Sequence, residues 1–265
     1  MAESIVVKCG GSTLKELSDS FFLSMKLLKD INITPIIVHG GGPEINALLN
    51  KLEVSSEFVN GLRKTTLEVL EVAEMVLTGK VNKAIVTKLQ KAGLTSIGIS
   101  GCDASLLKAL PINKAQLGFV GQVTDVNSEF LQQLISLNIV PVIAPIGIDD
   151  EGNHYNINAD TAAGAVAESI HAKKMIFVTD VPGILKNNEL QKVVTVTEIN
   201  EMINDGTIYG GMIPKVKAAI KCLQGNIEEV YIINGKGGNL MAGGELVGTK
   251  IVKVKELVTA ESVKS

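Results

Sequence analysis

The stretch Pro35-Ile-Ile-Val-His-Gly-Gly-Gly-Pro-Glu-Ile-Asn46 decides the fold that we expect for this chain. It begins with β-branched apolar residues, which predict a buried strand. Three glycines follow, and the apolar residues after them fall on one face of a helix. Such a strand, turn and helix N-terminus direct backbone N–H groups toward one point. A tight turn that needs positive φ is the plainer interpretation, but three consecutive glycines favour an anion site. Neither the Walker nor the Rossmann glycine spacing is present, so phosphate would be bound by a different arrangement.

A second glycine-rich strand end lies near the start of the chain. The apolar run from Ile5 leads into Lys8, Gly10 and Gly11. A lysine in so apolar a strand costs free energy unless an anion meets it. An edge-strand lysine that points to water is the alternative. A helix predicted over 17–31 joins this strand to the first stretch, which gives a β-α-β unit with parallel strands.

The hydrophobic pattern predicts alternating strands and helices over the rest of the chain. Two prolines in the apolar run 139–145 indicate an edge strand or an irregular one. The predicted helices cover 67–92, 128–137, 161–171, 197–205, 212–223 and 239–246, and the predicted strands cover 95–100, 119–126, 139–145, 175–180, 193–196, 229–233 and 249–254.

Composition limits the classes of function that the chain can have. With 265 residues, 46% of them hydrophobic, it can form one large α/β domain or two lobes that share a sheet. A net charge of −3 without a basic run argues against nucleic acid or an anionic membrane as partner. No apolar stretch approaches the roughly 20 residues that span a bilayer. Three widely spaced cysteines and three scattered histidines predict neither disulfides nor a metal site, and a cytoplasmic setting is expected.

Arg63 is the only arginine in the chain, against 24 lysines. Because the chain uses lysine elsewhere, the one guanidinium is a candidate functional group: its planar five-donor fork cannot be replaced by an ammonium. A structural salt bridge is the alternative. The segment Asn156-Ile-Asn-Ala-Asp160 opens a helix, and a helix has one N-cap, so caps alone do not explain three polar side chains. Lys215 starts another helix at the end that the helix dipole disfavours for a cation, which indicates a bound polyanion.

These motifs, in this order, resemble those of the amino-acid kinase family. The matching segments are Val7-Lys-Cys-Gly-Gly11, Val38-His-Gly-Gly-Gly42, Asn60-Gly-Leu-Arg63, Asn156-Ile-Asn-Ala-Asp160, Thr179-Asp-Val-Pro-Gly-Ile184 and Gly211-Met-Ile-Pro-Lys215. The resemblance implies a three-layer αβα sandwich around a mainly parallel sheet. It implies an N-terminal lobe, residues 1–172, that binds the acyl substrate and dimerises, and a C-terminal lobe, residues 173–265, that binds ATP. The motifs match best those members that phosphorylate the side-chain carboxylate of N-acetyl-L-glutamate in arginine synthesis.

The resemblance also assigns roles to individual residues. It implies that Lys8 and Lys215 neutralise the transferred phosphoryl group and that Asp160 orients both ammonium groups. The other implied contacts are with phosphate for Gly10 and Gly11, with substrate for Gly41, Gly42, Arg63 and Asn156, and with nucleotide for Asp180, Val181, Pro182, Gly183, Ile184, Leu185, Ile208, Tyr209 and Gly210.

The chemistry fits these residue types. A carboxylate nucleophile with a pKa near ~4.3 is already ionised at neutral pH, so the reaction needs cations and N–H donors and no general base. Mg²⁺ is expected to arrive on ATP, without a metal site built by the protein. The resemblance implies a homodimer that free arginine does not inhibit. The alternatives are another carboxylate kinase of the family, acting on an aminoadipate-, glutamate- or aspartate-like substrate, and a non-catalytic nucleotide-sensing module of the same fold.

Overall fold

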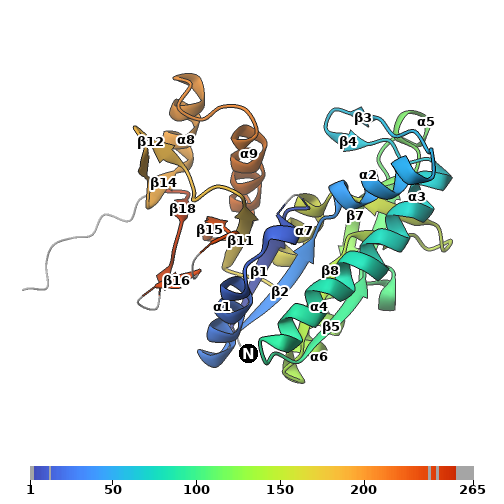
Figure 1. Ribbon diagram of the computed structural model, residues 1–265, viewed down its shortest axis with the longest axis horizontal. Coiled ribbons are helices and arrows are strands. Elements are labelled where there is room, and N and C mark those ends of the chain that lie inside the picture. Colours follow the sequence, from blue (N-terminus) through green and yellow to red (C-terminus); the bar gives the residue numbers. More distant parts are fainter. Residues whose placement is uncertain (1–2, 12, 238–239, 243–244, 255–265) are drawn as a thin grey trace, which may run out of the picture.

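The computed structural model describes residues 3–11, 13–237, 240–242 and 245–254 (Figure 1). Its central feature is an eight-stranded sheet. The strands follow one another across the sheet as β14 (Val193–Thr195), β18 (Thr249–Val252), β15 (Glu229–Asn234), β11 (Lys174–Thr179), β1 (Glu3–Cys9), β2 (Ile33–His39), β8 (Val140–Ala144) and β5 (Ser96–Ser100).

Neighbouring strands of this sheet are parallel, except for the antiparallel pair β15 and β18. β1 lies in the interior, in register with β11 on one side and β2 on the other, so that Lys8 is paired with both Phe177 and Val38. Lys8 is therefore not an edge-strand lysine. Because β1, β2 and β11 are parallel, their carboxyl ends lie at one edge of the sheet, where ligands bind in open α/β folds.

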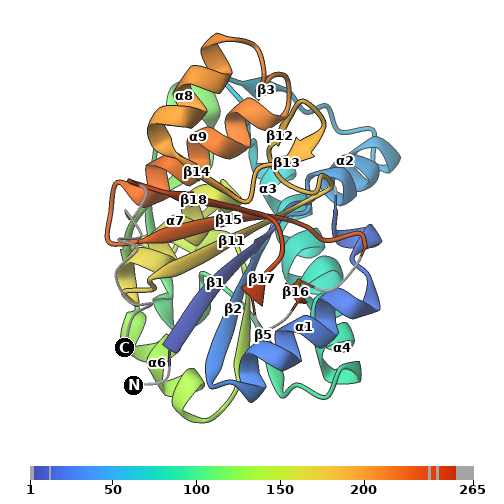
Figure 2. The same ribbon diagram turned by 90° about the vertical axis from the view of Figure 1, so that its left-hand side faces the viewer.

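Helices cover both faces of the sheet, and Figure 2 shows α1 and α4 on one side with α6 and α7 on the other. Side chains alternate along β1: Ile5 and Val7 join one hydrophobic core, and Val6 joins the other. The first core contains residues of α1 (Asp19–Asp30), α2 (Gly42–Lys51), α3 (Leu67–Glu74), η2 (Met75–Val81) and α4 (Asn82–Lys91); the second contains residues of α6 (Ser128–Ser136), α7 (Ala159–Ser169), α8 (Val196–Asn204) and α9 (Met212–Leu223). The predicted three-layer αβα sandwich with a mainly parallel sheet is confirmed.

Smaller elements lie outside the eight-stranded sheet. A closed four-stranded barrel brings β10 next to β7 and β9, and the sequence did not predict it. A short hairpin, β3 with β4, carries Arg63. The bounds are β3 (Phe58–Val59), β4 (Leu62–Arg63), β6 (Leu107–Pro111), β7 (Val120–Val126), β9 (Ile146–Ile148), β10 (His154–Ile157), β12 (Leu185–Lys186), β13 (Glu189–Leu190), β16 (Met241–Ala242), β17 (Glu245–Leu246), α5 (Lys114–Leu117), η1 (Leu14–Glu16) and η3 (Asp103–Ser105).

Two expectations from the sequence were wrong. The helix expected over 239–246 is absent in its described part, where β16 and β17 pair as antiparallel strands. The proline-containing strand β8 is neither at the edge nor irregular: it lies between β2 and β5 and is fully buried. The long helical region from 67 is confirmed, with the π-helix η2 in its middle. Within the described residues, no helix combines the length and apolar character that a membrane span needs.

Candidate active site

The two glycine-rich strand ends meet at the carboxyl edge of the sheet. Cys9 pairs with His39 in the ladder, and the next N–H group, that of Gly40, donates to the Cys9 carbonyl at 3.0 Å. A Cβ atom at Gly11 would lie 2.9 Å from the backbone nitrogen of Gly41 and 2.8 Å from that of Gly42. Glycine at position 11 therefore lets the two loops pack backbone against backbone, as an anion site of N–H donors requires.

Lys8 forms an ion pair across this edge with the helix α7. Its ammonium nitrogen is 2.7 Å from Oδ1 of Asp160, and the Lys8 side chain is 15% exposed. Asn158 is the N-cap of α7: its Oδ1 accepts from the backbone N–H groups of Asp160 and Thr161. The cap thus accounts for one polar residue of the cluster and leaves Asp160 for Lys8.

Arg63 is buried, with 7% of its surface exposed. Its Nη1 donates to Ser56 Oγ at 2.6 Å, its Nη2 donates to the Gly42 carbonyl at 3.4 Å, and its guanidinium carbon lies 4.7 Å from the centre of the Phe58 ring. Burial lowers the pKa of this guanidinium. No ion pair joins Arg63 to a carboxylate of the described residues, so the salt-bridge alternative finds no support. A buried cation without a counter-ion is costly, which makes this position suited to an incoming anion.

Asn156 is held at the end of β10 by a buried threonine. Its Nδ2 donates to Thr65 Oγ1 at 3.2 Å, and that hydroxyl donates to the Arg63 carbonyl at 2.8 Å. Because the amide nitrogen is oriented by Thr65, the amide oxygen of Asn156 remains an acceptor for a ligand. Thr65, two residues after Arg63, thus links the hairpin strand β4 to the barrel strand β10.

These residues line one cavity of about 200 Å³. Seven of the residues expected at the site line it: Lys8, Gly11, Gly41, Gly42, Arg63, Asn156 and Asp160. Gly10 is not part of this lining, although a Cβ atom there would be 3.9 Å from the Lys8 ammonium. The cavity therefore has two cations, one carboxylate and a cluster of backbone N–H groups in its wall.

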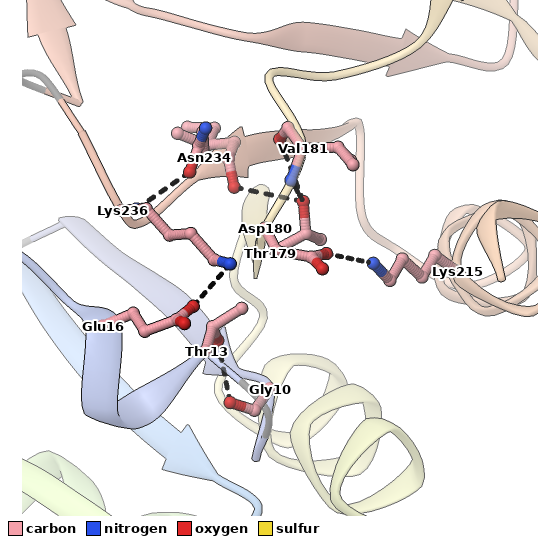
Figure 3. Close-up of polar contacts among 10 residues, drawn as sticks. Gly10, Thr13, Glu16, Thr179, Asp180, Val181, Lys215, Asn234 and Lys236 are labelled. Atoms are coloured by element: carbon pink, nitrogen blue, oxygen red, sulfur yellow. Dashed lines mark hydrogen bonds and ion pairs between the residues drawn. The ribbon is translucent and has the colours of Figure 1, made fainter.

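Lys215 lies apart from this cavity and has a different partner from the one expected. Its ammonium is 2.9 Å from Oδ1 of Asp180, as Figure 3 shows, and this contact is the main cause of the lowered pKa of Asp180. Asp160 was expected to orient both lysines; in the structure it contacts Lys8, and Lys215 contacts Asp180 instead. Asp180 follows β11 directly and faces the start of α9. The Lys215 ammonium is therefore paired with a carboxylate of the C-terminal part of the chain. Beside this pair, Lys236 contacts Glu16 at 2.5 Å (Figure 3).

The residues expected along the nucleotide follow β11 and precede α9. Asp180 to Ile184 connect β11 to β12, which begins at Leu185, and the N–H group of Ile184 donates to Thr249 Oγ1 at 2.8 Å. The side chains of Ile184 and Ile208 are buried in the core, so only their backbones can meet a ligand. Tyr209, by contrast, is 77% exposed, and Gly210 has a positive φ of 56° just before α9.

Sequence reasoning missed the residues that hold the predicted ones. Ser56 and Phe58 hold Arg63, Thr65 holds Asn156, and His39 contacts the glycine loop. Lys236 was missed as well. The contacts of Thr65 with Asn156 and of Lys236 with Glu16 join distant segments, for which the sequence carries little signal. Ser56, Phe58 and Thr65 lie close to the lone arginine in sequence, and that proximity could have drawn attention to them.

Comparison with known proteins decides the family. The model of the amino acid kinase family matches residues 3–234. The chain belongs to the amino acid kinase family. Among curated family members, the acetylglutamate kinase of Halalkalibacterium halodurans is 55% identical over 253 residues, which cover 96% of this chain and 97% of that protein. The acetylglutamate kinase of a Geobacillus species is 55% identical over 251 residues, covering 95% and 97%. A solved structure from Streptococcus mutans has a TM-score of 0.83, with 32% identity, and the match covers 96% of this chain and all of that one.

Membership of the amino acid kinase family agrees with the spread of the motifs. The matched range contains both glycine loops, Arg63, Asp160 and Lys215. Members of a kinase family use ATP as phosphoryl donor. The described residues contain no group of three or more His, Cys, Asp or Glu side chains placed to hold a metal ion.

Proposed function

We propose that this chain is an acetylglutamate kinase, which transfers the γ-phosphoryl group of ATP to the side-chain carboxylate of N-acetyl-L-glutamate in arginine biosynthesis. Relatives of that name are 55% identical over nearly the whole chain. The observation that carries the proposal is the cavity in which a buried guanidinium, with no carboxylate partner in the described part of the chain, lies beside two apposed glycine loops. A substrate with two carboxylates fits such a wall, one for Arg63 and one for the N–H groups near Lys8.

The reaction follows from the charges at this edge. A carboxylate oxygen attacks the γ-phosphorus, the bond from that phosphorus to the bridging oxygen breaks, and ADP leaves. The nucleophile is already ionised, so no residue has to remove a proton. In the transition state negative charge spreads over the equatorial oxygens. Lys8 and the N–H groups around Gly10 and Gly11 are proposed to stabilise that charge, and the ion pair between Asp160 and the Lys8 ammonium supports this role for Lys8.

The far end of the substrate determines which acid is bound. Arg63 is proposed to grip the α-carboxylate through two parallel N–H···O bonds. The amide oxygen of Asn156 is proposed to accept the acetamido N–H, while Gly41 and Gly42 donate to the reacting end. A free amino acid lacks the acetamido group and carries a cationic ammonium close to Arg63, so the pocket is expected to reject unmodified glutamate.

The nucleotide is proposed to bind along the C-terminal lobe, residues 173–265, with the acyl substrate in the N-terminal lobe, residues 1–172. Asp180 to Leu185 and Ile208 to Gly210 would lie along it, and Lys215 would move from Asp180 to the phosphates. Mg²⁺ would come bound to ATP and neutralise phosphate charge, in keeping with its preference for phosphate oxygens and water. A homodimer formed through the substrate lobes is also proposed, and β5 at the end of the sheet offers an edge for it. The cytoplasmic setting stays a prediction.

A coupled ADP-release assay tests the function. The chain is incubated with MgATP and, in parallel, with N-acetylglutamate, glutamate, aspartate or N-acetylaspartate. We expect saturable ADP release with N-acetylglutamate and at least ~10-fold lower kcat/KM with the others, the scale of one lost charge-assisted contact. Preference for another acceptor would replace the proposed substrate. If the chain binds nucleotide but releases no ADP with any of the four acceptors, a non-catalytic sensing module would be favoured.

A further inference from the structure

Behind the glycine loop lies a fully buried pair of polar side chains, His39 and Asn82. His39 is the last residue of β2, and Asn82 is the first residue of α4, directly after the π-helix η2. The Nδ1 atom of His39 is 2.9 Å from the carbonyl oxygen of Gly40, and its Nε2 atom is 3.2 Å from Nδ2 of Asn82. Buried polar groups are retained where every member finds a partner.

The hydrogen-bond partners fix the tautomer of His39 and the orientation of the Asn82 amide. A backbone carbonyl only accepts, so Nδ1 of His39 carries the proton and Nε2 accepts from Asn82. The amide nitrogen of Asn82 also lies 2.9 Å from the Val142 carbonyl and 3.3 Å from the Ile99 carbonyl, which identifies it as the donor side; its two hydrogens are shared among these carbonyls and Nε2 of His39. The Oδ1 atom of Asn82 accepts from the Lys83 ammonium at 3.1 Å. Burial lowers the pKa of His39 to about 4, in line with a neutral imidazole at working pH.

This arrangement acts on one peptide group of the cavity wall. The Gly40 carbonyl and the Gly41 N–H belong to the same planar trans peptide, and they point in opposite directions. When the imidazole holds the carbonyl inward, the Gly41 N–H must point away from His39, on the side where Gly11 lies. Glycines flank this peptide on both sides, so its own backbone preferences restrain it weakly.

The π-helix brings a second contact to the same loop. A Cβ atom at Gly41 would lie 2.6 Å from Cδ2 of Leu77, a residue of η2. Asn82 follows η2 directly and contacts His39. The Asn82 amide also packs against Gly98 of the edge strand β5. A Cβ atom at position 98 would lie 1.7 Å from Oδ1 of Asn82, so there is room for this amide only when residue 98 is glycine. Single-turn π segments often occur at functional sites, and here the segment places one side chain on the loop and one behind it.

We propose that His39 and Asn82 are positioning residues, which hold the Gly40–Gly41 peptide so that the Gly41 N–H points at the bound acyl substrate. The inference deepens the proposed function and rests on it. Neither side chain lines the cavity, so both act through the glycine loop. When these contacts are lost, we expect kcat/KM for the acyl substrate to fall, while KM for ATP changes little.

Two variants of His39 separate positioning from packing. In His39→Asn, the amide nitrogen takes the place of Nδ1 and can still donate to the Gly40 carbonyl. In His39→Gln, the amide oxygen takes the place of Nε2 as an acceptor next to Asn82, and the Gly40 carbonyl loses its donor. We expect His39→Gln to lower kcat/KM for N-acetylglutamate by about 10-fold or more, part of the effect of removing one oriented donor. His39→Asn should stay within about threefold of wild type, and KM for ATP should change less than about twofold in both.

A matched control and a double-mutant cycle complete the test. Ser24 of α1 is buried, and its hydroxyl accepts from the Leu240 N–H at 3.0 Å, a contact that involves no residue of the glycine loop. Ser24→Ala should lose stability without a change in kcat/KM. Gly98→Ala should impair catalysis in wild type but add little to Asn82→Ala, where the clash at Oδ1 is gone. Equal losses in His39→Gln and His39→Asn, or additive losses in the cycle, would overturn the inference while leaving the proposed function intact.

Amide hydrogen exchange at Gly41 provides a measure that needs no turnover. We expect faster exchange in His39→Gln than in His39→Asn, because the peptide without its carbonyl donor can rotate. Equal exchange in the two variants would contradict positioning even if the wild type proved to use another acceptor. Failure of the wild type with N-acetylglutamate would instead count against the proposed function.

Discussion

At the scale of single residues, Arg63 joins composition to structure. It is the only arginine of the chain, and the structure buries it beside a glycine loop without a carboxylate partner among the described residues. Its contacts with Ser56, Phe58 and the Gly42 carbonyl orient the guanidinium but do not neutralise it. The anionic substrate proposed above would balance this charge.

Substitution of Arg63 should act on the acyl substrate and not on ATP. A charge-assisted hydrogen bond contributes roughly 1.5–3 kcal/mol, so Arg63→Ala should raise KM for N-acetylglutamate at least ~10-fold. Arg63→Lys keeps the charge but loses the fork and should fall between. Michaelis constants for both substrates, measured on variants whose circular dichroism matches wild type, check this. An equal rise for ATP would mean that Arg63 has a structural role.

The two lysines should affect turnover. Lys8→Ala and Lys215→Ala are each expected to lower kcat by a factor on the order of 10²–10³, the usual effect of losing one preorganised donor. The double variant should fall short of the product of the two effects. Lys217→Ala, two residues along α9 and exposed, is the control and should be near wild type. Near-normal turnover of Lys215→Ala would show that the lysine only pairs with Asp180.

His39 should make stability depend on pH. Its pKa is about 4 in the folded chain and 6.5 when unperturbed, so at intermediate pH the unfolded chain binds more protons. The stability that neutral His39 contributes is complete above about pH 6.5 and is lost as the pH falls toward 4, by on the order of 3 kcal/mol. Urea unfolding from pH 7.5 to 4.5 should therefore show wild type losing more stability than His39→Asn. A pH-independent difference would contradict this.

At the scale of elements, the site depends on the close contact of two strand ends. The loops after β1 and β2 pack through their backbones because Gly11 has no side chain. β10 and the β3–β4 hairpin then close the cavity around them.

Gly11→Ala tests this contact. The new Cβ would lie 2.8 Å from the Gly42 nitrogen, and a backbone neighbour cannot move aside as a flexible side chain can. We expect kcat/KM for N-acetylglutamate to fall at least ~10²-fold, as when an oriented donor is removed. Gly79→Ala, in η2 with no atom within 4 Å of its Cβ, should keep activity and gain up to about 1 kcal/mol of stability. Activity of Gly11→Ala close to wild type would show that the loops tolerate separation.

The same elements show what a sequence can and cannot predict. The β-α-β unit and the paired glycine loops were predictable, because strand and helix periods and parallel pairing are local or follow from short connections. The barrel that carries Asn156 was not, because its strands pair through contacts that no local pattern records. The pairing of Lys215 with Asp180, 35 residues away, and of His39 with Asn82, 43 residues away, depends likewise on tertiary structure. The helix expected over 239–246 failed because apolar residues between glycines fit a hairpin equally well.

At the scale of the whole molecule, the charges for the reaction are divided between two parts of one sheet. Lys8, Asp160 and Arg63 line the cavity from β1, α7 and the β3–β4 hairpin, and Lys215 with Asp180 lies beyond β11. The parallel strands β1 and β11 are neighbours and end at the same edge of the sheet. An acyl substrate beyond the end of β1 and a nucleotide beyond the end of β11 would therefore be close enough for direct transfer of the phosphoryl group. The account therefore requires that the phosphoryl group end on the carboxylate.

Trapping of the product with hydroxylamine measures that requirement most directly. An acyl phosphate reacts with hydroxylamine to give a hydroxamate, which is identified by mass spectrometry and compared with ADP released in the same sample. We expect one hydroxamate of N-acetylglutamate per ADP in wild type, and loss of both together in Lys8→Ala. ADP released without hydroxamate, or a hydroxamate formed only from an acceptor without the acetyl group, would contradict the account.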